Sequence, residues 1–143
     1  MLLYLDNSVL NRPFDDQSQA RIWLETLSLS LILGLIESGE AECVCSPIHL
    51  LENNRNPLAV RRHWVSECLR RAHHRVHHSP AIHTRAQALE ASGVKPLDAL
   101  HAACAEAAGA THFLTCDDRL IRRYSGPLTV QTPATFITTI SQP

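Results

Sequence analysis

The sequence predicts an α/β fold built on a mainly parallel sheet, and three observations lead to that prediction. Short apolar runs alternate along the chain with longer segments of helical periodicity. Strands separated by helices form βαβ units, in which the strands run parallel. The length of 143 residues, with no internal repeat or low-complexity linker, is that of one domain. We therefore expect residues 1–143 to form a single domain.

Four short segments are predicted to be strands. The first, Leu2–Leu5, is a continuous apolar run, which is typical of a strand buried on both faces of a sheet. The later strands are expected over residues 42–46, 111–115 and 128–131. Residues 75–79 fit either a short strand or an extension of the helix before them.

Helices are predicted between these strands from apolar spacing and from residues that favour helix ends. The longest covers residues 17–38, and Gly39 is expected to stop it. The other predicted helices begin at or near residues 47, 58, 80, 97, 117 and 133. Residues 11–16 carry the Asn, Pro and Asp residues of a turn.

Composition excludes several classes of protein. The formal net charge is −1, so the chain has no basic field that could hold nucleic acid by charge alone. No apolar stretch approaches the roughly 20 residues of a membrane span, and the N-terminus lacks the pattern of a signal peptide. The five cysteines show no pairing pattern, which favours reduced thiols in a cytoplasmic protein.

Four carboxylates occupy related places in the predicted fold. Asp6 directly follows the first strand, and Asp117 follows the third. Glu52 lies on the helix after the second strand, and Asp98 lies in the first turn of a largely apolar helix. Each has a simple structural explanation when taken alone: a turn residue, a helix cap, a solvated helix face, or a partner of the helix dipole.

Taken together, the four carboxylates indicate a metal site. Strand ends and adjacent helix starts converge at one edge of a parallel sheet, where four carboxylates would repel one another. A divalent cation such as Mg²⁺ makes the cluster reasonable, because it prefers oxygen ligands. Ser8 can add a hydroxyl ligand or bind a phosphate, and Thr115 can orient Asp117.

These residues give the sequence its resemblance to the PIN-domain family, the metal-dependent ribonuclease fold that includes the VapC-type toxins. The matching segments extend over most of the chain, from residue 2 to about residue 123. They are Tyr4-Leu5-Asp6-Asn7-Ser8, Leu50-Leu51-Glu52, Pro96-Leu97-Asp98-Ala99-Leu100-His101-Ala102-Ala103 and Phe113-Leu114-Thr115-Cys116-Asp117. Residues 11–16 also look like a subgroup of bacterial PIN proteins.

The resemblance implies a three-layer sandwich with about five parallel strands and hydrolysis of RNA phosphodiester bonds. It implies that Asp6 and Asp98 are the core ligands of Mg²⁺ or Mn²⁺, and that Glu52 and Asp117 complete the acidic ring. Asp118 directly follows Asp117, so the choice between the two rests on the match alone. Position 7 is Asn where the family commonly has a small hydroxyl residue, although Ser8 keeps a hydroxyl nearby.

The resemblance also implies partners. The helix around residues 27–36 is apolar on more than one side, and in toxin relatives this region binds an antitoxin or a second subunit. We therefore expect a homodimer, and the chain fits the toxin of a toxin–antitoxin pair. Arg12 and Arg119 are candidate contacts to RNA phosphates, with an exposed charged surface as the alternative explanation.

Histidines form a second group of candidates. Five of them lie between His73 and His83, and helical spacing there would create pairs that can chelate Zn²⁺. A solvated, pH-responsive surface is the simpler interpretation. His101 shares a helix face with Asp98, and we expect it to pack between helices, with a place near the metal as the alternative.

Two other functions remain open from the sequence. A metal-dependent phosphatase of the aspartyl-phosphate kind can use a similar sheet, but its first strand typically ends in Asp-x-Asp, whereas this chain has Ser8 at the third position. A non-catalytic module that binds RNA or protein is the other alternative. It would keep the acidic pocket without using it.

Overall fold

A five-stranded parallel sheet forms the centre of the computed structural model, which describes residues 1–143. The strands are β1 (Leu2–Leu5), β2 (Glu42–Cys45), β3 (His74–Arg75), β4 (His112–Leu114) and β5 (Thr129–Gln131). Their order across the sheet is β3-β2-β1-β4-β5, and every neighbouring pair is parallel. β1 is therefore the central strand, and its C-terminal end lies in the middle of the carboxyl edge of the sheet.

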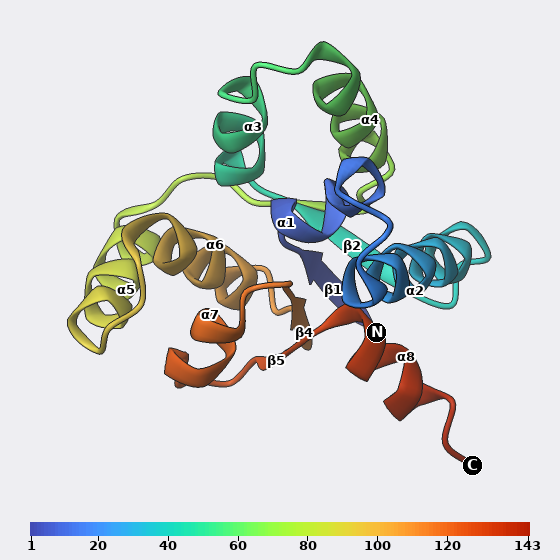
Figure 1. Ribbon diagram of the computed structural model, residues 1–143. Helices are drawn as coiled ribbons and strands as arrows, with labels where there is room; N and C mark the ends of the chain where they lie inside the picture. Colours follow the sequence, from blue (N-terminus) through green and yellow to red (C-terminus); the bar gives the residue numbers. More distant parts are fainter.

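Helices cover both faces of the sheet, which makes the predicted three-layer sandwich (Figure 1). On one face lie α2 (Ala20–Glu37), α4 (Ala59–Arg70) and α8 (Pro133–Ile140). The opposite face carries α5 (Pro80–Ala91), α6 (Pro96–Ala107) and α7 (Asp118–Arg123). The short α1 (Asn7–Leu10) and the helix α3 (Pro47–Asn54) follow β1 and β2 at the carboxyl edge. None of the helices combines the length and apolar character that a membrane crossing requires.

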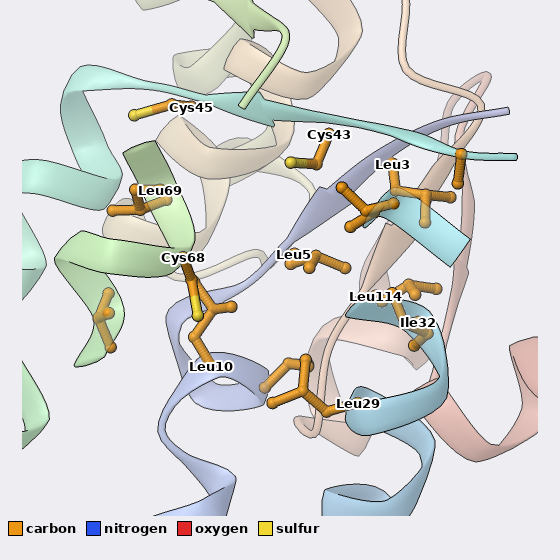
Figure 2. Packing of buried hydrophobic residues seen from close by; sticks show 14 of the residues in the cluster. Leu3, Leu5, Leu10, Leu29, Ile32, Cys43, Cys45, Cys68, Leu69 and Leu114 are labelled. Carbon is orange, nitrogen blue, oxygen red and sulfur yellow. The ribbon is translucent and has the colours of Figure 1, made fainter. Parts of the chain in front are cut away.

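The core divides into two apolar clusters, one on each face of the sheet. Alternate residues of β1 point to opposite faces, so Leu3 and Leu5 pack in one cluster while Tyr4 packs in the other. Figure 2 shows the first cluster, in which Leu29 and Ile32 of α2 approach the side chains of β1. The second cluster is rich in alanine from α6, which lets that helix lie close to the sheet. Both clusters are built mainly from aliphatic residues.

Most helix ends follow the chemistry expected from the sequence. The Ser46 side chain accepts a hydrogen bond from the backbone N–H of His49, and Thr132 accepts one from Thr135. Gly39 adopts a φ of 82°, a conformation that glycine reaches without steric cost, and it follows the end of α2 as predicted.

Three short segments were not predicted in full from the sequence. A helix of four residues, α1, begins directly after Asp6, where sequence periodicity was too short to indicate one. Part of the predicted turn at residues 11–16 is a 3₁₀ helix, η1 (Arg12–Phe14), in which Pro13 fits the first turn. Near residue 75, where a short strand and a helix extension both fitted, the structure has an edge strand, His74–Arg75, which extends the sheet beyond β2. The histidine pairs at helical spacing are therefore absent.

Candidate functional site

Asp6 lies at the centre of the carboxyl edge, where β1 ends and α1 begins. Its side chain is buried, and its Oδ2 atom accepts two hydrogen bonds of 2.8 Å, from the hydroxyls of Ser8 and Thr115. The Thr115 hydroxyl comes from the end of the neighbouring strand β4, so sheet pairing brings it to Asp6. The two hydroxyls fix the orientation of the carboxylate and leave Oδ1 facing the pocket.

Asp117 is held at the start of α7 by the same group of hydroxyls. Its backbone N–H donates to the Thr115 hydroxyl at 3.1 Å, and its Oδ1 atom accepts from the backbone N–H of Arg119 at 2.9 Å. Thr115 therefore orients both Asp6 and the turn that carries Asp117. Ser8 has a similar double role, because its hydroxyl donates to Asp6 and accepts from the backbone N–H of Cys116 at 3.2 Å.

Glu52 reaches the site from α3 and is only partly exposed. Its Oε1 atom lies 3.5 Å from the Nε2 atom of His101 on α6. The same nitrogen lies 3.9 Å from Oδ1 of Asp6. One potential ligand atom from each of these three residues lies within 4.8 Å of the others. Two helices and one strand thus bring together groups that are 95 residues apart in the sequence.

Asp98 faces the same centre from the first turn of α6. Burial raises the pKa of its carboxyl to about 6, and the negative charges of Asp6, Asp117 and Glu52 add to that increase. Because three other carboxylates raise this pKa, all four predicted acidic residues belong to one electrostatic site.

A small hollow beside Asp98 and Asp117 is bordered by positive charges. Lys95, Arg119 and Arg123 line it, and all three are exposed. Arg119, which lies on α7, borders this hollow together with Asp117. An anionic substrate can approach the carboxylates past these side chains.

The structure separates Asp117 from Asp118, which the sequence alone could not do. Asp118 is exposed and forms two hydrogen bonds of 2.7 and 2.9 Å with the guanidinium of Arg21 on α2. The same guanidinium donates to the carbonyl of Cys116 at 3.2 Å. Asp118 thus ties the β4–α7 turn to α2, while Asp117 turns towards the acidic centre.

Arg12 is already paired with two acidic side chains. Its guanidinium lies 3.0 Å from Glu25 and 3.1 Å from Asp15. Glu25 is almost fully buried on α2, which makes the arginine its main source of positive charge together with Arg21, at 3.5 Å. This network links η1, α2 and the β4–α7 turn. The Arg21–Glu25 pair has helical spacing in the sequence, whereas the Arg12–Glu25 and Arg21–Asp118 pairs depend on the tertiary structure.

The donor set of the pocket fits a hard divalent cation. Asp6 and Glu52 offer carboxylate oxygens that lie within 4.8 Å of each other and of the unpartnered Nε2 atom of His101. Asp98 and Asp117 are not part of this group and line the hollow beside it. Carboxylate oxygens are the ligands that Mg²⁺ and Mn²⁺ prefer. A cation would also offset the repulsion that raises the pKa of Asp98.

Comparison with known protein families agrees with this geometry. The model of the PIN domain matches residues 3–126, which include all four carboxylates. A search of curated proteins found no match.

Proposed function

The chain belongs to the PIN-domain family, and from that membership and its acidic pocket we propose that it is a metal-dependent endoribonuclease. PIN domains are in general metal-dependent nucleases. The observation that carries the proposal is the close approach of the Asp6 and Glu52 carboxylates, beside a hollow that Asp98 and Asp117 line. Its substrate is RNA, and its cofactor is Mg²⁺ or Mn²⁺.

In this proposal Asp6 and Asp98 hold the cation, and Glu52 and Asp117 complete the acidic ring. When bound, the cation supplies Lewis-acid stabilisation of the phosphodiester and a water nucleophile at neutral pH. The hydroxyls of Ser8 and Thr115 keep the Asp6 carboxylate in one orientation, which supports a pre-organised site.

Positive side chains near the carboxylates support an RNA substrate. We propose that Arg119 contacts a phosphate, because it is exposed and lines the hollow beside Asp98 and Asp117. Arg12 is less suited to that role, because its guanidinium is paired with Glu25 and Asp15. The phosphatase alternative gains no support, because the Ser8 hydroxyl, where that class has an acid, donates to Asp6.

The proposal is tested by incubating purified protein with structured and single-stranded RNAs in Mg²⁺, Mn²⁺ or EDTA. We expect cleavage only with metal, and none by an Asp98→Asn variant purified in the same way. A Glu90→Gln variant, altered at an exposed residue of α5, should cleave like the parent. Calorimetric titration that detects no binding of either cation to the parent would refute the proposal.

We also propose that the protein is a cytoplasmic homodimer and the toxin of a toxin–antitoxin pair. Support for the dimer comes from α2, where Trp23, Leu24, Leu27 and Leu31 are large apolar residues exposed to solvent. Five free cysteines support a reducing compartment. Light scattering should give twice the chain mass of 15.9 kDa, and a Leu27→Lys/Leu31→Lys double variant should give the monomer mass. A monomeric parent would contradict the dimer.

A further inference from the structure

A buried row of polar side chains lies directly beneath the acidic centre. It consists of Tyr4, Ser46, His49 and His101, all with 1% exposure or less. The Tyr4 hydroxyl is central, 2.6 Å from the Ser46 Oγ atom and 2.5 Å from the His101 Nδ1 atom. Nothing in the nuclease chemistry proposed above uses these groups. Their hydrogen bonds determine which nitrogen of His101 carries the proton.

The contacts of His49 determine which groups of this row donate and which accept hydrogen bonds. The backbone N–H of Ser46 donates to His49 Nδ1 at 3.0 Å, so that nitrogen carries no hydrogen. His49 Nε2 lies 2.7 Å from the carbonyl oxygen of Leu5, which can only accept. His49 is therefore the neutral Nε2–H form, and the lone pair of its Nδ1 atom is already occupied.

The Ser46 hydroxyl consequently donates to Tyr4. Its hydrogen has two nitrogen or oxygen acceptors within reach, the Tyr4 oxygen at 2.6 Å and His49 Nδ1 at 3.4 Å, and the Cys104 sulfur is a third and weaker acceptor. The second is distant and already accepts from the Ser46 backbone. A tyrosine hydroxyl that accepts from Ser46 must send its single hydrogen onwards, to His101 Nδ1. His101 Nδ1 is thus an acceptor, and the hydrogen of the neutral ring is on Nε2.

We propose that His101 is a positioning residue, whose Nε2–H is directed at the carboxylates of Glu52 and Asp6, and that it is not a metal ligand. Its Nε2 atom lies 3.5 Å from Glu52 Oε1 and 3.9 Å from Asp6 Oδ1, and it is buried without a hydrogen-bond partner, so these two carboxylates are its nearest acidic neighbours. A nitrogen that carries hydrogen has no lone pair for a cation, although this nitrogen lies where a ligand would. The Tyr4 hydroxyl therefore keeps the donor set all-oxygen, which favours Mg²⁺ and Mn²⁺ over Zn²⁺.

The tautomer is measured without metal, by ¹⁵N NMR of histidine-labelled protein at pH 8. The His101 signals are identified by their loss in the His101→Gln variant. We expect Nε2 to resonate as a hydrogen-bearing, pyrrole-type nitrogen and Nδ1 as a pyridine-type nitrogen. The reverse pattern would overturn the proposal. This experiment is independent of nuclease activity and of metal binding.

The second measurement uses Mn²⁺, and so rests on the proposed function. Pulsed EPR of the Mn²⁺ complex should show no coupling from a directly bound imidazole ¹⁴N nucleus, and such a coupling would refute the assignment. If no Mn²⁺ binds, the proposed function fails while the NMR experiment still decides the tautomer.

Two substitutions of His101 distinguish a positioning residue from a metal ligand. Glutamine can keep an N–H donor near the place of Nε2, so His101→Gln should retain Mn²⁺ affinity within about threefold. His101→Phe removes the donor and should weaken binding about 10- to 100-fold. Equal losses in the two variants would contradict a donor role. A His112→Gln control, at the opposite end of β4, should bind Mn²⁺ like the parent. If the phenylalanine variant does not fold, the two spectra and the glutamine variant still test the proposal.

Discussion

Replacing Asp98 by asparagine should stabilise the metal-free protein at pH 8 while it abolishes activity. The folded protein raises the pKa of Asp98 to about 6, from an ordinary value of 3.8, through burial and through the charges of Asp6, Asp117 and Glu52. The folded state therefore keeps a proton at pH values where the unfolded chain has lost it. It follows that this group disfavours folding increasingly as the pH rises from 3.8 to 6, and fully above 6.

The size of the effect follows from the difference between the two pKa values. The difference between 6 and 3.8 corresponds to a ceiling of about 3 kcal/mol. Asp98 is partly exposed, so solvent screening reduces this ceiling, and we expect a gain of about 1–2 kcal/mol at pH 8. The same difference in pKa predicts that, at pH 4.5, the variant keeps roughly a third of the gain in stability that it has at pH 8.

Urea unfolding in EDTA at both pH values measures the difference. The Glu90→Gln control removes an exposed carboxylate from α5 and should change stability by less than about 0.5 kcal/mol. Added Mn²⁺ should then stabilise the parent more than the variant, because only the parent keeps all four carboxylates. A variant that is no more stable than the parent at pH 8, or equally more stable at both pH values, would refute the electrostatic argument.

Three further predictions follow from the surroundings of the site. Thr115→Val removes the hydroxyl that orients two carboxylates and should weaken Mn²⁺ binding about 10- to 100-fold in calorimetry, whereas Thr138→Val on α8 should have no effect. Glu25→Ala removes the buried carboxylate that Arg12 and Arg21 share and should lower the free energy of unfolding by about 2 kcal/mol, against less than about 0.5 kcal/mol for the exposed Glu40→Gln; equal urea midpoints would contradict this. Burial raises the pKa of the Cys43, Cys68, Cys104 and Cys116 thiols to about 11 or 12, so their alkylation at pH 8, followed by mass spectrometry, should be at least about 100-fold slower in the native protein than in urea.

The fold class could be predicted because its signals are local. The apolar run Leu2–Leu5 and the helices with proline or serine at their starts have periods and caps that depend only on neighbouring residues. Two gaps in the prediction have one cause: it missed the helix at residues 7–10, and it left a choice between strand and helix near residue 75. Segments of two to four residues are too short for a period, and pairing with β2 or attachment to β1 decides their conformation.

The candidate site was partly predictable for a similar reason. Asp6 and Asp117 follow strands, and parallel strands end at a common edge, so their proximity follows from the fold class. The presence of Glu52 and Asp98 in the site could be predicted only with the family resemblance as well, because a carboxylate on a helix is usually solvated. The contacts of His101 with Tyr4 and Glu52 could not be predicted, since nothing in their spacing marks them.

The sequence by itself determined an α/β chain with four carboxylates at the ends of strands and the starts of helices. Apolar periodicity and turn residues depend on a few neighbouring positions, so the elements that they predict can be recognised without knowledge of the fold. Tertiary structure alone decided that Asp117 faces the acidic centre while Asp118 pairs with Arg21. It also decided that Tyr4 hydrogen-bonds His101 across 97 residues of sequence. Orientation and protonation depend on partners from distant segments, and only packing brings those partners together.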